Sequence, residues 1–135
     1  LIVGFGKACE ISKSLMYEEN IRIKKYREKL ISNILHAFPK SIINGDIDNR
    51  ISGNINISFP FLNGKSIITS IPKIAISSGS ACTSSDPKPS HVLKELGINK
   101  LDSNTTLRIG IGRFNTNEDI KIASESIINA IKLKL

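Results

Sequence analysis

Apolar residues recur at a helical spacing over the first part of the chain, residues 1–38. One stripe consists of Ile2, Phe5, Cys9 and Met16, and a second consists of Ile23, Leu30, Ile31, Ile34, Leu35 and Phe38. Residues repeating about every 3.6 positions share one face of an α-helix, and Pro39 cannot continue that helix. The pattern therefore predicts a long N-terminal helix. Cys9, on the apolar stripe, has the placement typical of a buried structural cysteine.

Period-two alternation predicts strands in the second part of the chain. Ile55, Ile57 and Phe59 alternate with Asn56 and Ser58, so apolar side chains share one face of this strand and polar side chains the other. Further short strands are expected at residues 41–44, 74–76 and 106–112.

Helices are expected between these strands and at the end of the chain, at residues 66–71, at 90–96 and from Thr116 onward. Ser90 is placed to N-cap the second helix, and Gly97 is placed to end it. Thr116, with Asp119 three residues later, resembles a capping box that opens the last helix. The buried face of that helix is predicted to carry Ile120, Ala123, Ile127, Ile128 and Ile131.

The order of elements predicts an α/β (α+β) sandwich, in which a small sheet is covered by helices. Residues 1–38 are assigned to a long linking helix, and residues 39–135 to a small sheet-and-helix domain with a polar loop at 77–89. A chain of 135 residues is long enough for one domain with its own core. Because Ile dominates the apolar residues and only 5% of the chain is aromatic, we expect that core to be aliphatic.

The charge balance leaves two interpretations open. Lys and Arg number 19 against 12 Asp and Glu, a formal net charge of +7, which favours acidic partners including nucleic acid. The basic residues are scattered, however, and the densest cluster, residues 22–29, also contains Tyr26 and Glu28. A solvated helix face is therefore favoured over a nucleic-acid patch. Because the sequence lacks an initiator Met, we expect a chain cut from something longer, and because Leu1–Gly6 lacks a basic n-region, we do not expect this start to be a signal peptide.

The chemistry of the chain centres on Cys82. Cys9 and Cys82 lie far apart, and neither belongs to a CxxC pair or a zinc-spaced cluster. Cys82 sits among the small polar residues of segment 77–85, where a thiol is accessible and able to react as a thiolate. On composition alone, an ordinary cysteine in a surface loop explains it equally well.

The string Ser-Ser-Gly-Ser-Ala-Cys-Thr-Ser at residues 77–84 resembles the signature around the persulfide-forming cysteine of cysteine desulfurases of the iron–sulfur-assembly (Isc/Nif) type. These are class-V aminotransferase-family, fold-type-I enzymes that depend on pyridoxal phosphate (PLP). The similarity continues in register at residues 2–8, 44–46, 55–59, 89–97 and 107–114. The resemblance implies that the chain is the small C-terminal domain of such an enzyme, entered by the long helix that leaves the cofactor domain.

The resemblance also implies roles for particular residues. Cys82 matches the nucleophile that takes sulfur from L-cysteine as a persulfide, leaving alanine, and passes it to iron–sulfur cluster assembly. It is also a candidate transient ligand of a 2Fe–2S cluster shared with a scaffold protein.

Arg108 matches the family's arginine for the substrate carboxylate, with a surface ion pair as the alternative. Independently of the resemblance, side-chain alternation predicts that Arg113 projects to the other face if the strand continues, so the two arginines are not expected to serve one carboxylate. Asn56 matches an asparagine of the family, for which a structural hydrogen bond is as good an explanation as a ligand role. His36 and His91 are not expected to act as bases.

The family's PLP-binding lysine and the other cofactor contacts match nothing in this chain, so no cofactor-binding residue is assigned. The implied partners are L-cysteine, a missing large PLP domain and an iron–sulfur scaffold or other sulfur acceptor, in a cytoplasmic or organelle-matrix homodimer without nucleic acid or membrane. Residues 85–88 depart from the usual pattern, and the family's C-terminal extension has no counterpart before Leu135. The chain alone is expected to be inactive. The alternatives are a non-enzymatic sulfur-carrier or interaction remnant and, within the enzyme class, a selenocysteine lyase, although the cysteine loop favours the iron–sulfur type.

Overall fold

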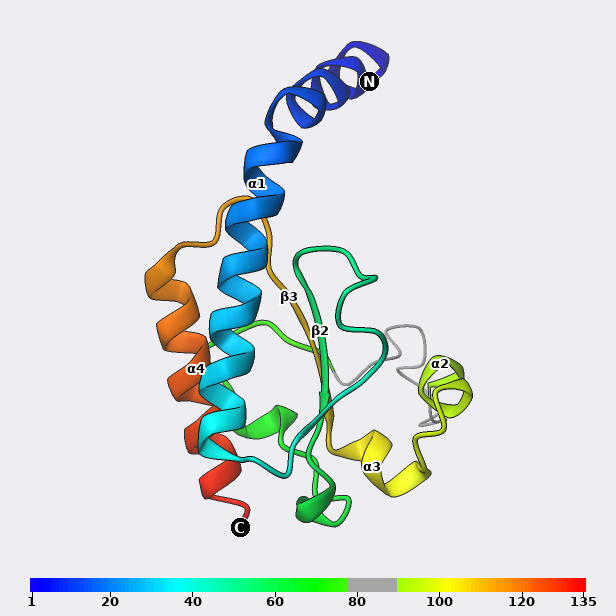
Figure 1. The fold of residues 1–135 in the computed structure, drawn as a ribbon, viewed down its shortest axis with the longest axis vertical. Helices are drawn as coiled ribbons and strands as arrows, with labels where there is room; N and C mark the ends of the chain where they lie inside the picture. The colour runs from blue at the N-terminus through cyan, green and yellow to red at the C-terminus, as the bar shows by residue number, and fades with distance from the viewer. Residues whose placement is uncertain (78–89) are drawn as a thin grey trace.

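The computed structural model describes residues 1–77 and 90–135, and Cys82 lies outside them. A long helix is followed by strands and short helices, and a second long helix closes the described chain (Figure 1). The elements are α1 (Ile2–Ala37), β1 (Ile42–Ile43), β2 (Asn54–Ser58), the 3-10 helices η1 (Pro60–Leu62) and η2 (Ile68–Ser70), α2 (His91–Glu95), α3 (Lys100–Asn104), β3 (Thr106–Gly110) and α4 (Asn117–Lys132). The predicted long N-terminal helix is confirmed.

The three strands form one antiparallel sheet in the order β1-β2-β3. The pairing of β2 with β3 sets Ile55 opposite Ile109 and Asn56 opposite Arg108. Because side chains alternate along a strand, this register gives the sheet one apolar face and one polar face. The predicted small sheet is therefore present, and the helices that cover it pack on its apolar face.

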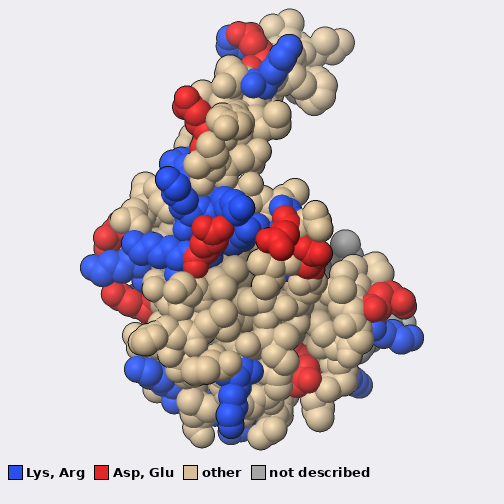
Figure 2. Space-filling model, viewed as in Figure 1, with Lys and Arg blue, Asp and Glu red and all other residues tan. Residues whose placement is uncertain are grey.

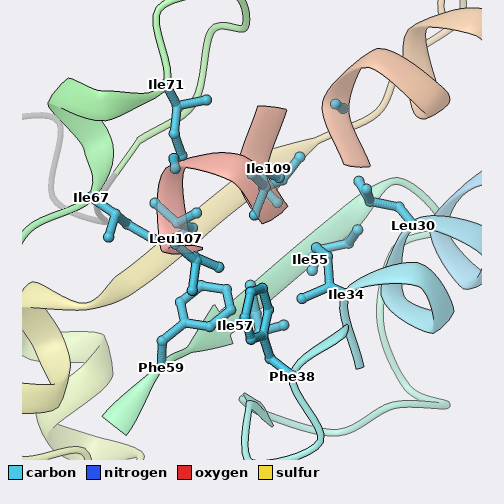
Figure 3. Packing of buried hydrophobic residues seen from close by; sticks show 14 of the residues in the cluster. Leu30, Ile34, Phe38, Ile55, Ile57, Phe59, Ile67, Ile71, Leu107 and Ile109 are labelled. Carbon is cyan, nitrogen blue, oxygen red and sulfur yellow. The ribbon is translucent and has the colours of Figure 1, made fainter. Parts of the chain in front are cut away.

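The apolar face of the sheet packs against α1 and α4, which lie side by side (Figure 1). Figure 3 shows Leu30 and Ile34 of α1 meeting Ile55 and Ile57 of β2. All of these side chains are fully buried, and each contributes about 1.5–3 kcal/mol relative to an exposed position. The core is aliphatic as expected, with Phe38 and Phe59 among its few aromatic members.

The capping box predicted for the last helix is present at the start of α4. The Thr116 hydroxyl accepts a hydrogen bond from the Asp119 backbone N–H at 3.2 Å, and the Asp119 carboxylate accepts one from the Thr116 N–H at 2.8 Å. These bonds satisfy donors that a helix start leaves unpaired. The bonds from the Thr116 N–H and hydroxyl hold the pKa of Asp119 below its ordinary value.

Several sequence-based expectations were wrong in detail. Residues 74–76 form no strand, and the bridge with β3 in this part of the described chain is made by the next residue, Ser77, opposite Arg108. The helix expected at 66–71 is only the 3-10 turn η2. Ser90 precedes α2 but makes no side-chain capping bond, whereas Gly97 has the left-handed φ of +76° that suits the end of a helix.

The first apolar stripe of α1 does not reach the core. The N-terminal part of the helix projects away from the sheet (Figure 1), and Ile2 and Phe5 are exposed. Cys9 is exposed as well, so the expectation of a buried structural thiol was wrong for this chain. No described helix is long and apolar enough to cross a membrane.

Candidate functional site

Four segments of the chain meet in one line across the polar face of the sheet. Asn56 of β2 lies opposite Arg108 of β3, and the Asn44 backbone N–H donates to the Asn56 carbonyl at 2.9 Å. On the far side of β3, Ser77 and Arg108 exchange two backbone hydrogen bonds, of 2.7 and 3.2 Å. Asn44, Asn56, Arg108 and Ser77 therefore form what is called here the transverse row.

Arg108 presents its guanidinium to solvent. Its strand neighbours Leu107 and Ile109 are buried in the core, so alternation directs Arg108 out of the opposite face. Within residues 1–77 and 90–135 the guanidinium makes no hydrogen bond and no ion pair. A surface ion pair with a described residue therefore does not explain this arginine, which remains open to a bidentate anion such as a carboxylate.

Arg113 binds a residue of α1 and does not face the same side as Arg108, in agreement with the predicted separation of the two arginines. Its guanidinium forms a two-point ion pair with Glu19 of α1, with Nη2 at 2.9 Å from Oε2, and this pair raises the pKa of Arg113. Arg22 donates to the carbonyls of Arg113 and Asn115 at 2.6 and 2.9 Å. These contacts join α1 to the connection between β3 and α4.

Behind the transverse row runs a chain of hydrogen bonds that the sequence did not reveal. The side-chain amide of Asn44, which is only 7% exposed, donates to Asn56 Oδ1 and to Ser58 Oγ, each at 2.7 Å. Ser58 Oγ lies 2.6 Å from Thr106 Oγ1, which donates to the Asp102 carbonyl at 2.7 Å. The alternating polar positions of β2 and β3 were the only sign of this hydrogen-bond chain in the sequence. Which side chain bonds which became apparent only from the register of the strands.

Cys82 belongs to residues 78–89, which are outside the described residues. What is described is the start of its segment, Ser77, beside Arg108. His36 and His91 are exposed and do not belong to the transverse row. Among the described residues, no group of His, Cys, Asp or Glu is arranged to hold a metal ion.

The described lysines do not fit a cofactor-binding role. A lysine that forms a Schiff base is tuned by a desolvating pocket or by a neighbouring cation. Every described lysine is exposed except Lys134, which is half-buried near the C-terminus. The described residues therefore offer no lysine site for PLP.

The basic residues on the visible surface are mixed with acidic ones. In Figure 2, Lys and Arg gather around the middle of α1 together with Asp and Glu. Lys24 lies 4.0 Å from Glu28 one helical turn away, and Lys121 lies 3.9 Å from Glu118. This alternation is typical of a solvated helix face and argues against a continuous basic patch.

The fold and the transverse row define a small sheet-and-helix domain with an exposed arginine beside the start of a cysteine-bearing segment. Residues 1–122 match the family described as Aminotransferase class-V, and the chain belongs to that family. The resemblance to cysteine desulfurases is confirmed: the chain is 48% identical over 132 residues to "Cysteine desulfurase IscS" of Ehrlichia chaffeensis, covering 98% of this chain and 32% of that protein. It is 39% identical over 132 residues to "Cysteine desulfurase" of Homo sapiens, covering 98% and 29%.

Solved structures give the same fold. A NifS-like protein from Rickettsia africae superposes with a TM-score of 0.78 at 24% identity, covering 97% of this chain and 34% of that one. A second NifS-like protein superposes with a TM-score of 0.80 at 22% identity, covering 98% and 33%. The chain thus spans about a third of the length of the relatives that it matches.

Proposed function

We propose that this chain is the C-terminal part of a PLP-dependent cysteine desulfurase and that it supplies the sulfur-accepting Cys82 and the carboxylate-binding Arg108. The observation that carries the proposal is the double hydrogen bond between Ser77 and Arg108. It fixes the start of the cysteine-bearing segment beside the one residue of the transverse row that can clamp an anion.

Arg108 is suited to the carboxylate of L-cysteine. Its planar guanidinium offers parallel N–H donors to the two oxygens of a carboxylate, and it stands on a strand, β3, that is paired with β2 on one side and bridged to Ser77 on the other. A rigid strand places such a side chain more accurately than a loop does. Arg108 would therefore orient the amino acid relative to the segment that carries Cys82.

Cys82 would accept the substrate sulfur. Its thiolate attacks the sulfur of L-cysteine, the bond from that sulfur to the β-carbon breaks, and a new sulfur–sulfur bond forms. The sulfur is oxidised to the sulfane level while the β-carbon is reduced and takes up a proton, giving alanine. One substrate cysteine and one enzyme thiol thus yield alanine and one enzyme persulfide, with no outside oxidant or reductant.

The cofactor domain would come from the part of the relatives that this chain does not cover, since the described lysines offer no PLP site. From Cys82 the sulfur would pass to a scaffold protein of iron–sulfur cluster assembly or to another acceptor, with Cys82 as a transient ligand of a 2Fe–2S cluster during transfer. The names of the relatives support the desulfurase reaction. The transfer of sulfur to an acceptor protein is a further part of this proposal.

The test is persulfide formation in a holoenzyme assembled from this chain and the cofactor domain of the Ehrlichia relative. Cyanolysis after exposure to L-cysteine measures the bound sulfane sulfur. We expect Cys82→Ser to abolish it and the matched control Cys9→Ser to retain it, because Cys9 lies on the projecting end of α1. Equal sulfane sulfur on the two variants, or none on the unmodified assembly, would overturn the proposal.

A further inference from the structure

The hydrogen-bond chain behind the transverse row has a fixed direction. It ends on the Asp102 carbonyl, which can only accept a hydrogen bond. Thr106 must therefore donate its hydroxyl hydrogen to that carbonyl. Ser58 must then donate to Thr106 across their 2.6 Å contact. Because a hydroxyl carries a single proton, Ser58 Oγ can only accept from Asn44, which therefore directs its amide nitrogen toward it.

The same amide nitrogen of Asn44 also contacts the Asn56 side chain, at 2.7 Å. Asn56 has to accept that bond through its carbonyl oxygen, which places its own NH₂ group on the other arm of the amide, away from Asn44. An isolated asparagine leaves the choice between oxygen and nitrogen open, but here the accept-only carbonyl of Asp102 decides it. No described residue accepts a hydrogen bond from the Asn56 NH₂.

Asn56 stands directly opposite Arg108, on the same face of the sheet. Side chains at directly opposed positions of an antiparallel pair are close neighbours, with Cβ atoms about 4.5–5.5 Å apart. The face therefore presents two donor groups next to each other, the guanidinium and the amide NH₂. Such a pair suits a ligand group that only accepts, and a carboxylate with its roughly four lone-pair sites is that group.

We propose that Asn56 is a second donor to the substrate carboxylate, beside Arg108, and that Asn44 is a positioning residue that orients the Asn56 amide. The proposal rests on the proposed function, since it assigns a further substrate contact to the same site. The competing explanation is that Asn56 serves only to attach the edge segment at Asn44 to β2. The two explanations differ in what Asn56 does to substrate affinity.

Kinetics of the assembled holoenzyme separate them. We expect Asn56→Ala to raise KM for L-cysteine about tenfold, the usual weight of a hydrogen bond to a charged group, with a smaller change in kcat. Asn56→Asp should raise KM further, because it sets a negative charge against the carboxylate. Asn44→Ala should raise KM less than Asn56→Ala, since it frees the amide without removing it. The matched control is Asn54→Asp, on the same face of β2 but opposite Gly110, which should leave KM unchanged.

A second measurement does not depend on turnover. In nuclear magnetic resonance spectra of the full chain, adding acetate should shift the side-chain amide of Asn56 together with the Arg108 Nε–H, and leave the Asn54 amide in place. If the assembly turns over but the Asn56 variants match the Asn54 control, the inference fails while the proposed function stands. If the assembly forms no persulfide, the proposed function fails, and acetate shifts at Asn56 and Arg108 still decide the inference: their presence supports it, and their absence overturns it.

Discussion

Replacing Gly53 with Ala should destabilise this fold through a backbone contact that leaves no room for a methyl group. Gly53 lies just before β2 and accepts a hydrogen bond from the Ile111 N–H at 2.8 Å, beyond the end of β3. A Cβ at position 53 would stand 2.0 Å from the Ile111 carbonyl oxygen and 3.0 Å from its carbonyl carbon. Backbone atoms in a hydrogen-bonded pair cannot swing aside as the end of a side chain can.

The size of the effect follows from three contributions. Forcing an extra carbon into a packed site costs about 1–3 kcal/mol. Moving the backbone apart weakens the bond between Gly53 and Ile111, whose net value is about 1 kcal/mol. In the opposite direction, Ala lowers the conformational entropy of the unfolded chain, a gain of about 0.4–1 kcal/mol. The free energy of unfolding should therefore fall by about 1–3.5 kcal/mol in Gly53→Ala.

Gly110 provides the matched control, because a Cβ there would meet nothing within 4 Å. It lies at the end of β3, so Gly110→Ala should leave stability unchanged or raise it by up to about 1 kcal/mol. Urea unfolding of the full chain, followed by far-ultraviolet circular dichroism, gives the midpoint and the slope for each variant. Equal midpoints for the two variants, or a Gly53→Ala chain as stable as the unsubstituted one, would refute the reasoning from the Ile111 contact.

Three further predictions concern the site, α4 and the cofactor. Arg108→Ala in the assembled holoenzyme should lower kcat/KM for L-cysteine by an amount corresponding to about 2–5 kcal/mol, as for truncation of one partner of a buried charge pair; near-normal kinetics would make Arg108 merely structural. Thr116→Ala should cost about 1 kcal/mol of stability at neutral pH through loss of the α4 cap, measured by urea unfolding. Because the folded-state pKa of Asp119 is depressed, its contribution is present above the unfolded pKa and is lost as the pH falls through the folded pKa, so the deficit of Thr116→Ala should shrink in acid; a deficit independent of pH would contradict this. Finally, the chain alone should show no saturable PLP binding by absorbance titration and release no sulfide from L-cysteine, and multiple turnovers from it would reverse that expectation.

The sequence determined the features that depend on residues close together in the chain. A helical apolar period and Pro39 set the extent of α1, and period-two alternation located β2 and β3. The capping box at Thr116 could be predicted because both of its partners lie within one turn. Cys82 and Arg108 were selected as candidates by their resemblance to a family, and the family itself is borne out by the match over residues 1–122.

The tertiary structure alone decided which of these residues stand next to each other. The strand expected at residues 74–76 is absent, and a bridge between the next residue, Ser77, and Arg108 positions the start of the cysteine-bearing segment. The apolar stripe containing Cys9 remains exposed, because amphipathic spacing shows which face a helix could bury but not whether a partner covers it. The orientation of the Asn56 amide depends on Asn44 and, through Ser58 and Thr106, on the carbonyl of Asp102. A hydrogen bond has a direction that only its full set of neighbours can fix, and strand register, rather than local spacing, brings those neighbours together.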